Sequence, residues 1–167
     1  MNFSLLPKVQ TTALTDITQS WLESRGISVL MLDFDNTIVP YTTDMPTEKM
    51  AAWLEGMKHS GITLCVVSNS RNNRVLHFCR KWGIDCITRA KKPFSIGIRK
   101  CMEHYGVQPA ECALVGDQIF TDTLGANCVG VTSVLVKAID NHNIWLKLRH
   151  IAEMPFIFLA RKRRIIV

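Results

Sequence analysis

The sequence predicts a doubly wound α/β fold with a mostly parallel sheet, and three observations support this prediction. Short apolar runs alternate along the chain with longer segments that have helical periodicity. The connections between them are short, and several of the helical segments stop at a glycine. Within the apolar runs, polar and apolar residues do not alternate, which is typical of strands covered on both faces of a sheet. Strands that alternate with helices across short loops indicate an α/β sheet.

The first predicted strand spans residues 28–34 and contains a short apolar run that leads into an acid. In the predicted helix 47–60, Thr47 is a candidate N-cap, and Gly61 would end the helix. The sequence shows no internal repeat and no low-complexity segment. The remaining elements are expected, in chain order, to be strand 62–67, helix 73–82, strand 84–88, helix 95–105, strand 112–115, helix 121–128, strand 131–136 and an amphipathic helix 143–153.

Length and composition favour a single globular domain. A chain of 167 residues can bury about two thirds of its unfolded surface. Hydrophobic residues make up 47% and charged residues 20%, which excludes intrinsic disorder. The six cysteines form no C-x-x-C pair, so we expect free thiols in a reducing compartment. The sequence shows no signal-peptide pattern and no apolar run of the roughly 18 residues that a spanning helix needs, which favours a cytoplasmic protein.

Positive charge is concentrated at the C-terminal end of the chain. The formal net charge is +6, and residues 144–167 hold six basic residues and one acid, a net +5. Such a basic segment attracts the phosphates of nucleic acids or of anionic lipid headgroups, or it is simply a solvated terminus. We therefore divide the chain into a main domain, 1–153, and a basic and apolar tail, 154–167.

Polar side chains directly follow four of the predicted strands. Because ligands bind outside the carboxyl ends of the strands in a doubly wound sheet, we expect these side chains to lie close together. They are Asp33, Asp35 and Thr37 after the first strand, Ser68 and Asn69 after the second, Lys92 after the third, and Asp117 and Asp122 after the fourth.

The types of these residues indicate phosphoryl-transfer chemistry. Three clustered carboxylates, Asp33, Asp35 and Asp117, would repel one another unless a cation joined them, and carboxylates with water suit Mg²⁺. Lys92 and the backbone amides near Ser68 would face the other half of the site and could hold an anion. A hard divalent cation beside a positive pocket is the arrangement that phosphoryl transfer requires.

The motifs resemble, in their order along the chain, the four motifs of the haloacid dehalogenase (HAD) superfamily. More narrowly, the chain resembles the YqeG-type group of subclass III phosphatases, which is related to the mitochondrial phosphatidylglycerophosphate phosphatases. This resemblance extends from about residue 3 to residue 153. Lys91 competes with Lys92 for the third motif, and Lys92 is favoured because it precedes Pro93. The motifs are Asp33-x-Asp35-x-Thr37, Ser68, Lys92 and Gly116-Asp117 with Asp122 five residues later.

The resemblance implies a catalytic role for each of four residues. Asp33 would attack the phosphorus and form an aspartyl-phosphate, which divides hydrolysis into two easier steps. Asp35 would protonate the leaving oxygen and then deprotonate the attacking water. Ser68 would donate a hydrogen bond to a phosphoryl oxygen, and Lys92 would neutralise charge on the phosphoryl group. The substrate phosphate is thus expected to contact Ser68 and Lys92, together with Thr37 and Asn69.

The resemblance also implies a magnesium site. Mg²⁺ would be held by Asp33, by the backbone carbonyl of Asp35 and by Asp117. Asp122 would not bind the metal directly but would position its water ligands or Lys92. Asp122 could instead cap a helix. Two further alternatives stay open: Asn36 and Asn69 are turn formers or ligand contacts, and Arg71 reaches a substrate headgroup or is solvated.

The spacing of the motifs leaves no room for a cap domain over the site. Thirty residues lie between Thr37 and Ser68, and twenty lie between Ser70 and Lys91, which is enough for one helix and one strand each. An open site admits a large substrate, such as a lipid, protein or nucleic-acid phosphate. The resemblance implies phosphatidylglycerophosphate, so we expect a phosphatase for this lipid or for another large phosphate ester. The tail could then contact the anionic inner membrane surface. The alternatives are a phosphatase for a small soluble ester and a nucleic-acid or ribosome-associated binding protein.

Overall fold

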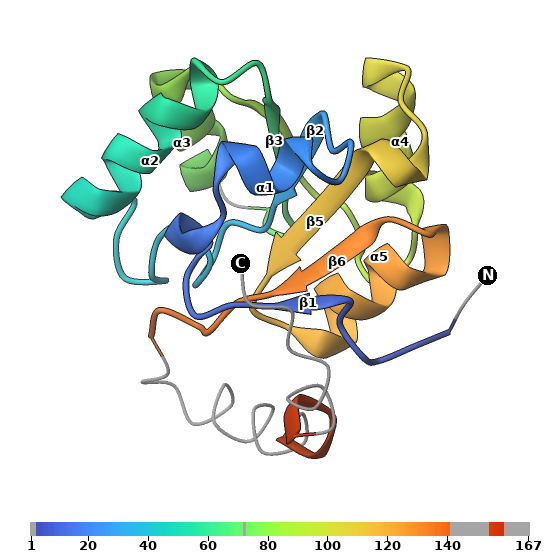
Figure 1. Ribbon diagram of the computed structural model, residues 1–167. Coiled ribbons are helices and arrows are strands. Elements are labelled where there is room, and N and C mark those ends of the chain that lie inside the picture. Colours follow the sequence, from blue (N-terminus) through green and yellow to red (C-terminus); the bar gives the residue numbers. More distant parts are fainter. Residues whose placement is uncertain (1–2, 72, 141–153, 159–167) are drawn as a thin grey trace.

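A six-stranded sheet, in which every neighbouring pair of strands is parallel, forms the centre of the structure (Figure 1). The computed structural model describes residues 3–71, 73–140 and 154–158 of the chain. The predicted doubly wound parallel sheet is therefore confirmed. In the sheet order β1-β6-β5-β2-β3-β4, the strands are β1 (Val9–Gln10), β6 (Thr132–Leu135), β5 (Cys112–Gly116), β2 (Val29–Leu32), β3 (Thr63–Val67) and β4 (Asp85–Ile87).

The order of the strands reverses next to β2. From β2 the chain adds β3 and then β4 on one side, and it returns to add β5 and β6 on the other. As a result, β2 pairs with β3 on one side and with β5 on the other. Ligands of open parallel sheets bind at the carboxyl ends of the strands where such a reversal occurs. The topology thus predicts a site at the ends of β2, β3 and β5.

Helices cover both faces of the sheet (Figure 1). In β2, Leu30 and Leu32 belong to the core cluster that includes α1, α2 and α3, whereas Val29 and Met31 belong to the cluster that includes α4 and α5. Because both faces of β2 are covered, the strand is apolar throughout. The helices are α1 (Gln19–Glu23), α2 (Glu48–Lys58), α3 (Asn73–Trp82), α4 (Ile96–Tyr105) and α5 (Leu124–Val129).

The bounds of most predicted elements differ by a few residues from those in the structure, and two of the differences lie next to the polar motifs. The predicted strand 28–34 ends at Leu32, so the polar residues of the first motif lie just beyond the strand. The first three residues of the predicted helix 121–128 belong to a π-helix, Ile119–Thr123, which leads directly into α5. The predicted N-cap of α2 is confirmed, since the side chain of Thr47 accepts a hydrogen bond from the backbone of Met50.

The sequence pattern does not predict the elements before β2. The strand β1, the 3-10 turn Leu14–Asp16 and α1 are each five residues or shorter, too short to show a period. The predicted helix 143–153 lies outside the described residues, and of the tail only 154–158 is described, as a helix. Among the described residues, no helix has the length and apolar character needed to cross a membrane.

The described part of the chain contains no cap domain. Between β2 and β3 it holds one helix, α2, and between β3 and β4 it holds one helix, α3. These are the two segments in which the spacing of the motifs predicts no room for an insertion. Within the described residues, no inserted domain therefore follows β2 or β3.

Candidate active site

The central strands deliver the predicted motif residues to one place at the carboxyl edge of the sheet. Asp33 follows β2, and its backbone N–H donates to the carbonyl of Val115 in β5 at 2.8 Å. Ser68 follows β3, and Asp117 follows β5. The side chains here are nearly all buried, which is unusual for charged groups unless they are paired. The buried polar residues at this edge are Asp33, Asn36, Thr37, Ser68, Lys92, Asp117 and Asp122.

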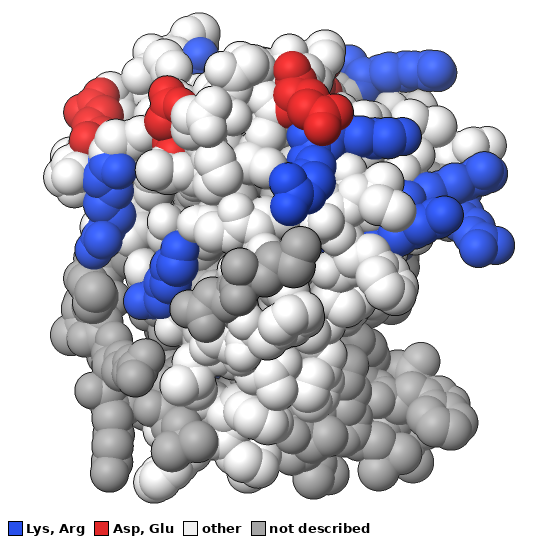
Figure 2. Space-filling model, turned by 90° about the vertical axis from the view of Figure 1, so that its right-hand side faces the viewer, with Lys and Arg blue, Asp and Glu red and all other residues white. Residues whose placement is uncertain are grey.

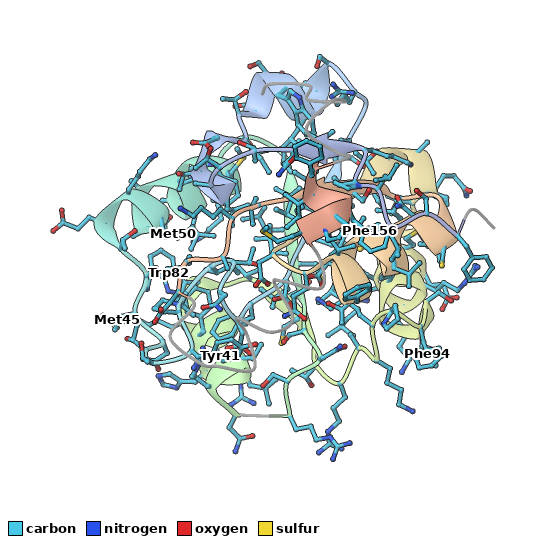
Figure 3. The ribbon with its side chains drawn as sticks, turned by 90° about the horizontal axis from the view of Figure 1, so that it is seen from below. Tyr41, Met45, Met50, Trp82, Phe94 and Phe156 are labelled. Carbon is cyan, nitrogen blue, oxygen red and sulfur yellow. The ribbon has the colours of Figure 1, made fainter. Side chains whose placement is uncertain are left out.

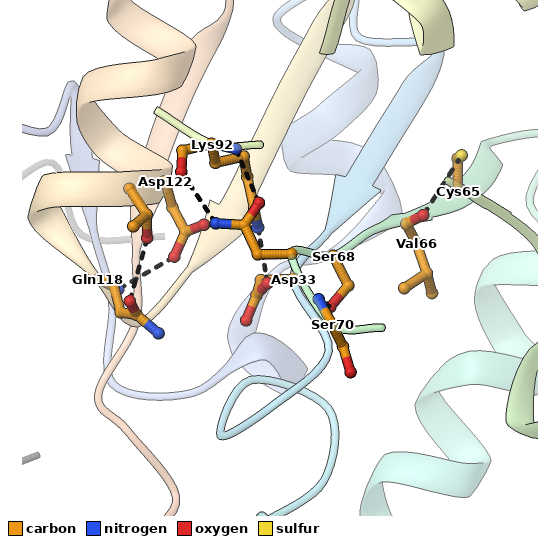
Figure 4. Close-up of polar contacts among 10 residues, drawn as sticks. Asp33, Cys65, Val66, Ser68, Ser70, Lys92, Gln118 and Asp122 are labelled. Carbon is orange, nitrogen blue, oxygen red and sulfur yellow. Dashed lines mark hydrogen bonds and ion pairs between the residues drawn. The ribbon is translucent and has the colours of Figure 1, made fainter. Parts of the chain in front are cut away.

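A buried lysine lies at the centre of the site (Figure 4). The Nζ atom of Lys92 is 2.6 Å from Oδ1 of Asp33 and 2.7 Å from Oδ1 of Asp122. Burial disfavours the ammonium, but the charges of Asp122 and Asp33 outweigh this effect, so the pKa of Lys92 is raised. Lys91 is exposed. The structure therefore brings Lys92, and not its neighbour, to the carboxylates.

The surroundings of Asp33 destabilise the ionised form of its carboxyl group. Its pKa is raised to about 7, because burial and the charges of Asp122 and Asp35 together outweigh the opposing effect of Lys92. A cation placed beside Asp33 would favour the ionised form, because opposite charges stabilise each other strongly where water is excluded. Ionisation is also what a nucleophilic carboxylate requires.

Three carboxylates could hold that cation. Asp33, Asp117 and Asp122 each offer one oxygen, and these three atoms lie within 4.8 Å of one another. Lys92 supplies a single positive charge to this group, which leaves an excess of negative charge in a buried place. A hard divalent ion such as Mg²⁺ prefers carboxylate oxygens, so the donor set fits it. The predicted ligands Asp33 and Asp117 belong to this group, while the predicted carbonyl ligand of Asp35 stays a prediction.

The π-helix after β5 positions Asp122. The backbone N–H of Gln118 donates to Oδ2 of Asp122 at 3.1 Å, while Oδ1 of Asp122 pairs with Lys92. Orientation of Lys92, one of the two roles proposed from the sequence, therefore has a matching contact. The other role is to cap a helix, but the N-cap residues of the π-helix and of α5 are Gln118 and Thr123. The absence of a side chain at Gly116 makes room for this carboxylate, since a Cβ there would overlap with Asp122.

Asn69 fixes the backbone of the lysine. Its Nδ2 donates to the carbonyl of Lys92 at 2.9 Å, and its Oδ1 accepts from the N–H of Lys92 at 2.7 Å. Both ends of the amide are thus used to join the loop after β3 to the loop after β4. Nothing in the sequence pattern indicates this clamp. The predicted contact of Asn69 with substrate phosphate stays a prediction.

Two hydroxyls border the same cluster. The Oγ of Ser68 accepts a hydrogen bond from the backbone N–H of Ser70 at 3.1 Å, which leaves its own proton available to an anion. The hydroxyl of Thr37 is buried and has no hydrogen-bond partner among the described residues. Asn36, which precedes Thr37, has a left-handed backbone with φ of 63°. It is therefore a turn former, one of the two alternatives considered from the sequence.

Asp35 is held by an arginine that the motif analysis does not identify. The Nη2 of Arg74, in the first turn of α3, donates to Oδ1 of Asp35 at 2.6 Å. Burial raises the pKa of Asp35, and the charges of Arg74 and Lys92 oppose this effect. Arg71, the arginine considered from the sequence, is exposed. Arg74 belongs to no motif, and only its place on a helix face could have indicated its role.

Comparisons with known proteins identify the family of this chain. A family model described as mitochondrial PGP phosphatase matches residues 2–139. The chain is 33% identical over 120 residues to a Bacillus subtilis (strain 168) protein named "Probable phosphatase YqeG", an alignment that covers 72% of this chain and 70% of that protein.

Solved structures share the fold. One is the cobalt-bound form of a deoxy-D-mannose-octulosonate 8-phosphate phosphatase from Haemophilus influenzae, with a TM-score of 0.54, 11% identity, and coverage of 83% of this chain and 92% of that one. Another is a 3-deoxy-D-manno-octulosonate 8-phosphate phosphatase from Moraxella catarrhalis, in complex with magnesium, phosphate and KDO, with a TM-score of 0.50, 16% identity, and coverage of 83% and 95%. These structures show the fold alone, whereas the family model, which matches most of the chain, shows the family. This chain belongs to the mitochondrial PGP phosphatase family, within the HAD superfamily, and is a phosphatase.

Proposed function

We propose that this phosphatase hydrolyses phosphatidylglycerophosphate, with Mg²⁺ and through an aspartyl-phosphate on Asp33. The observation that carries the proposal is the buried Lys92 held between Asp33 and Asp122, with Asp117 beside them. A buried ammonium next to a carboxylate lowers the repulsion between that carboxylate and an incoming phosphate dianion.

In the first step, a carboxylate oxygen of Asp33 attacks phosphorus. A bond forms between this oxygen and phosphorus, and the bond from phosphorus to the ester oxygen of the substrate breaks. The leaving oxygen takes the proton of the Asp35 carboxyl group and departs as an alcohol. The raised pKa of Asp35 fits this role, because a half-buried carboxyl group retains its proton to a higher pH than an exposed one.

In the second step, water releases the phosphate. Asp35, now ionised, takes a proton from the water, whose oxygen attacks the phosphorus of the aspartyl-phosphate. The bond between Asp33 and phosphorus breaks, which regenerates the free carboxylate and inorganic phosphate. Lys92 and the hydroxyl of Ser68 are placed to stabilise phosphoryl oxygens in both steps. Asp33 and Asp117, with Asp122 beside them, would hold Mg²⁺, which would neutralise charge that develops on the phosphoryl group.

The surface around the site supports an amphiphilic, anionic substrate. Exposed apolar side chains stand in loops that leave the carboxyl ends of two strands, at Tyr41 and Met45 after β2 and at Phe94 after β4 (Figure 3). Exposed basic side chains occur in the loops after β3 and β4, at Arg71 and Lys91 among others. Figure 2 shows lysine and arginine side chains at the right of the face in view and others at its centre and left. Apolar and basic groups together suit a phospholipid.

The basic tail remains part of the proposal as a contact with anionic membrane. Most of it lies outside the described residues. Within the described part, the ring of Phe156 lies against that of Phe120 in the π-helix, with centroids 6.1 Å apart. A segment tethered next to the fourth motif would lie close to the substrate entrance.

Hydrolysis of vesicle-borne phosphatidylglycerophosphate tests the proposal. The purified chain with Mg²⁺ should release phosphate from such vesicles faster than from equal concentrations of glycerol 3-phosphate or a nucleotide monophosphate. Excess chelator should stop the reaction, and Asp33→Asn should abolish it while leaving the circular dichroism spectrum unchanged.

Each result has a separate meaning. Preferential turnover of the soluble esters would remove the lipid substrate and favour the small-ester alternative. Turnover by Asp33→Asn at the wild-type rate would remove the aspartyl-phosphate. Activity that persists in excess chelator would remove Mg²⁺ from the reaction, and tight RNA binding without any hydrolysis would favour the nucleic-acid alternative.

A further inference from the structure

We infer that Arg74 is a positioning residue for the reaction, which holds the carboxyl group of Asp35 where it can give its proton to the leaving oxygen. The inference rests on the proposed function, because Asp35 is the acid of that mechanism. It extends the mechanism by one residue that belongs to none of the four motifs.

A single guanidinium joins α3 to the loop that carries the first motif. Besides its bond to Oδ1 of Asp35, the Nη2 of Arg74 donates to the carbonyl of Pro40 at 3.2 Å, and its Nη1 donates to the carbonyl of Tyr41. The Cζ of Arg74 lies 5.0 Å from the centre of the Phe34 ring. The guanidinium thus contacts the loop on both sides of Asp35 along the chain.

These contacts restrict the carboxyl group more than a surface ion pair would. The side chains of Arg74 and Asp35 are only 19% and 18% exposed, so water competes little for the bond. The guanidinium is planar and carries its donors in a fixed arrangement, and its position is set by two carbonyls and an aromatic ring as well as by the carboxylate. Asp35 therefore meets a donor that has little freedom to move.

The contact also distinguishes the two oxygens of Asp35. Oδ1 is bound to Arg74, whereas among the described residues no hydrogen bond is made to Oδ2. Oδ2 is therefore the oxygen left to exchange a proton with the leaving group and with water. Without Arg74 the carboxyl group could rotate, and the proton would meet the leaving oxygen less often in the required geometry.

The dependence of the rate on the leaving group tests this role. Aryl phosphates have good leaving groups that need little protonation, whereas alkyl phosphates depend on the acid. Arg74→Met should lower kcat for an alkyl phosphate such as glycerol 3-phosphate by about 10- to 100-fold. This is less than the roughly 10²–10⁴-fold that a general acid contributes, because the acid itself remains. For 4-nitrophenyl phosphate the loss should stay within about 3-fold, with KM for both substrates little changed. Arg74→Lys, which retains the charge and one donor nitrogen, should recover part of the alkyl rate.

Two further variants separate positioning from a general effect on structure. Arg80→Met removes the same charge from an exposed position of the same helix and should leave both rates unchanged. In an Asp35→Asn background, Arg74→Met should cause no additional loss, because its effect acts through Asp35. Equal losses on the two substrates, or full additivity with Asp35→Asn, would overturn the inference, and a rise in KM alone would make Arg74 a substrate contact instead. Neither substrate is phosphatidylglycerophosphate, so these results are independent of whether the lipid is hydrolysed.

Discussion

The glycine of the fourth motif should be required for stability as well as for activity. Gly116 ends β5, and a Cβ built there would overlap with Oδ2, Cγ and Cβ of Asp122. That carboxylate has little freedom to move away, because Oδ1 pairs with Lys92 and Oδ2 accepts from Gln118. Gly116→Ala must therefore displace either β5 or the partner of the central lysine.

The size of the effect follows from these contacts. Inserting a methyl group into a packed interior costs about 1–3 kcal/mol of unfolding free energy. Removal of one partner from a buried ion pair costs about 3–5 kcal/mol, and Gly116→Ala displaces Asp122 without removing it. We expect a loss of about 3 kcal/mol, at the overlap of the two ranges. For a chain of this size the melting temperature should fall by about 6–12 °C.

Thermal unfolding followed by circular dichroism measures this loss, and Gly56→Ala is the matched control. Gly56 lies inside α2, and a Cβ there would meet no atom within 4 Å. The control should raise the unfolding free energy by about 0.5–1 kcal/mol, because alanine favours a helix over glycine. If Gly116→Ala melts at the wild-type temperature or above it, the packing argument is wrong.

Three other measurements address the charges and the clamp of the site. With divalent cations removed, the contribution of Asp33 to the free energy of unfolding should fall as pH rises from about 4 towards 7. Over this range the folded carboxyl group keeps a proton that the unfolded one, with a pKa of 3.8, has lost. Urea unfolding should show this fall in the wild type, and Asp33→Asn should lack it. At neutral pH, Mg²⁺ at 100 times its dissociation constant should stabilise the protein by about 2.7 kcal/mol in thermal melts, and Asp117→Asn should remove most of this gain. Asn69→Ala removes two hydrogen bonds to the backbone of Lys92 and should cost about 1–3 kcal/mol in urea unfolding, with a fall in kcat; unchanged stability would show that the loops after β3 and β4 hold each other without the amide.

The sequence was sufficient for the sheet and for the place of the site because each rests on a local pattern. A strand covered on both faces must be apolar at every position, as β2 is, and its run of apolar residues is visible without any knowledge of its neighbours. A charged residue directly after such a run, such as Asp33 or Asp117, then lies at the carboxyl end of a strand, where ligands bind. The short β1 has no comparable pattern, because its position depends on pairing with β6, more than a hundred residues later.

The residues that hold the catalytic groups were harder to predict, because their roles depend on which way a side chain turns. Arg71 and Arg74 are three residues apart, and motif spacing does not separate them. Helix geometry does: Arg74 is four residues before Phe78, so both lie on one face of α3. The ring of Phe78 packs against Phe34 of the first motif, 5.2 Å between centroids, and the same face brings Arg74 over that ring and onto Asp35. A cation in the first turn of a helix is also placed against the helix dipole, which an anionic partner compensates. A basic residue at the start of a helix and on its buried face therefore indicates a carboxylate nearby, and in this protein that carboxylate is the proposed acid.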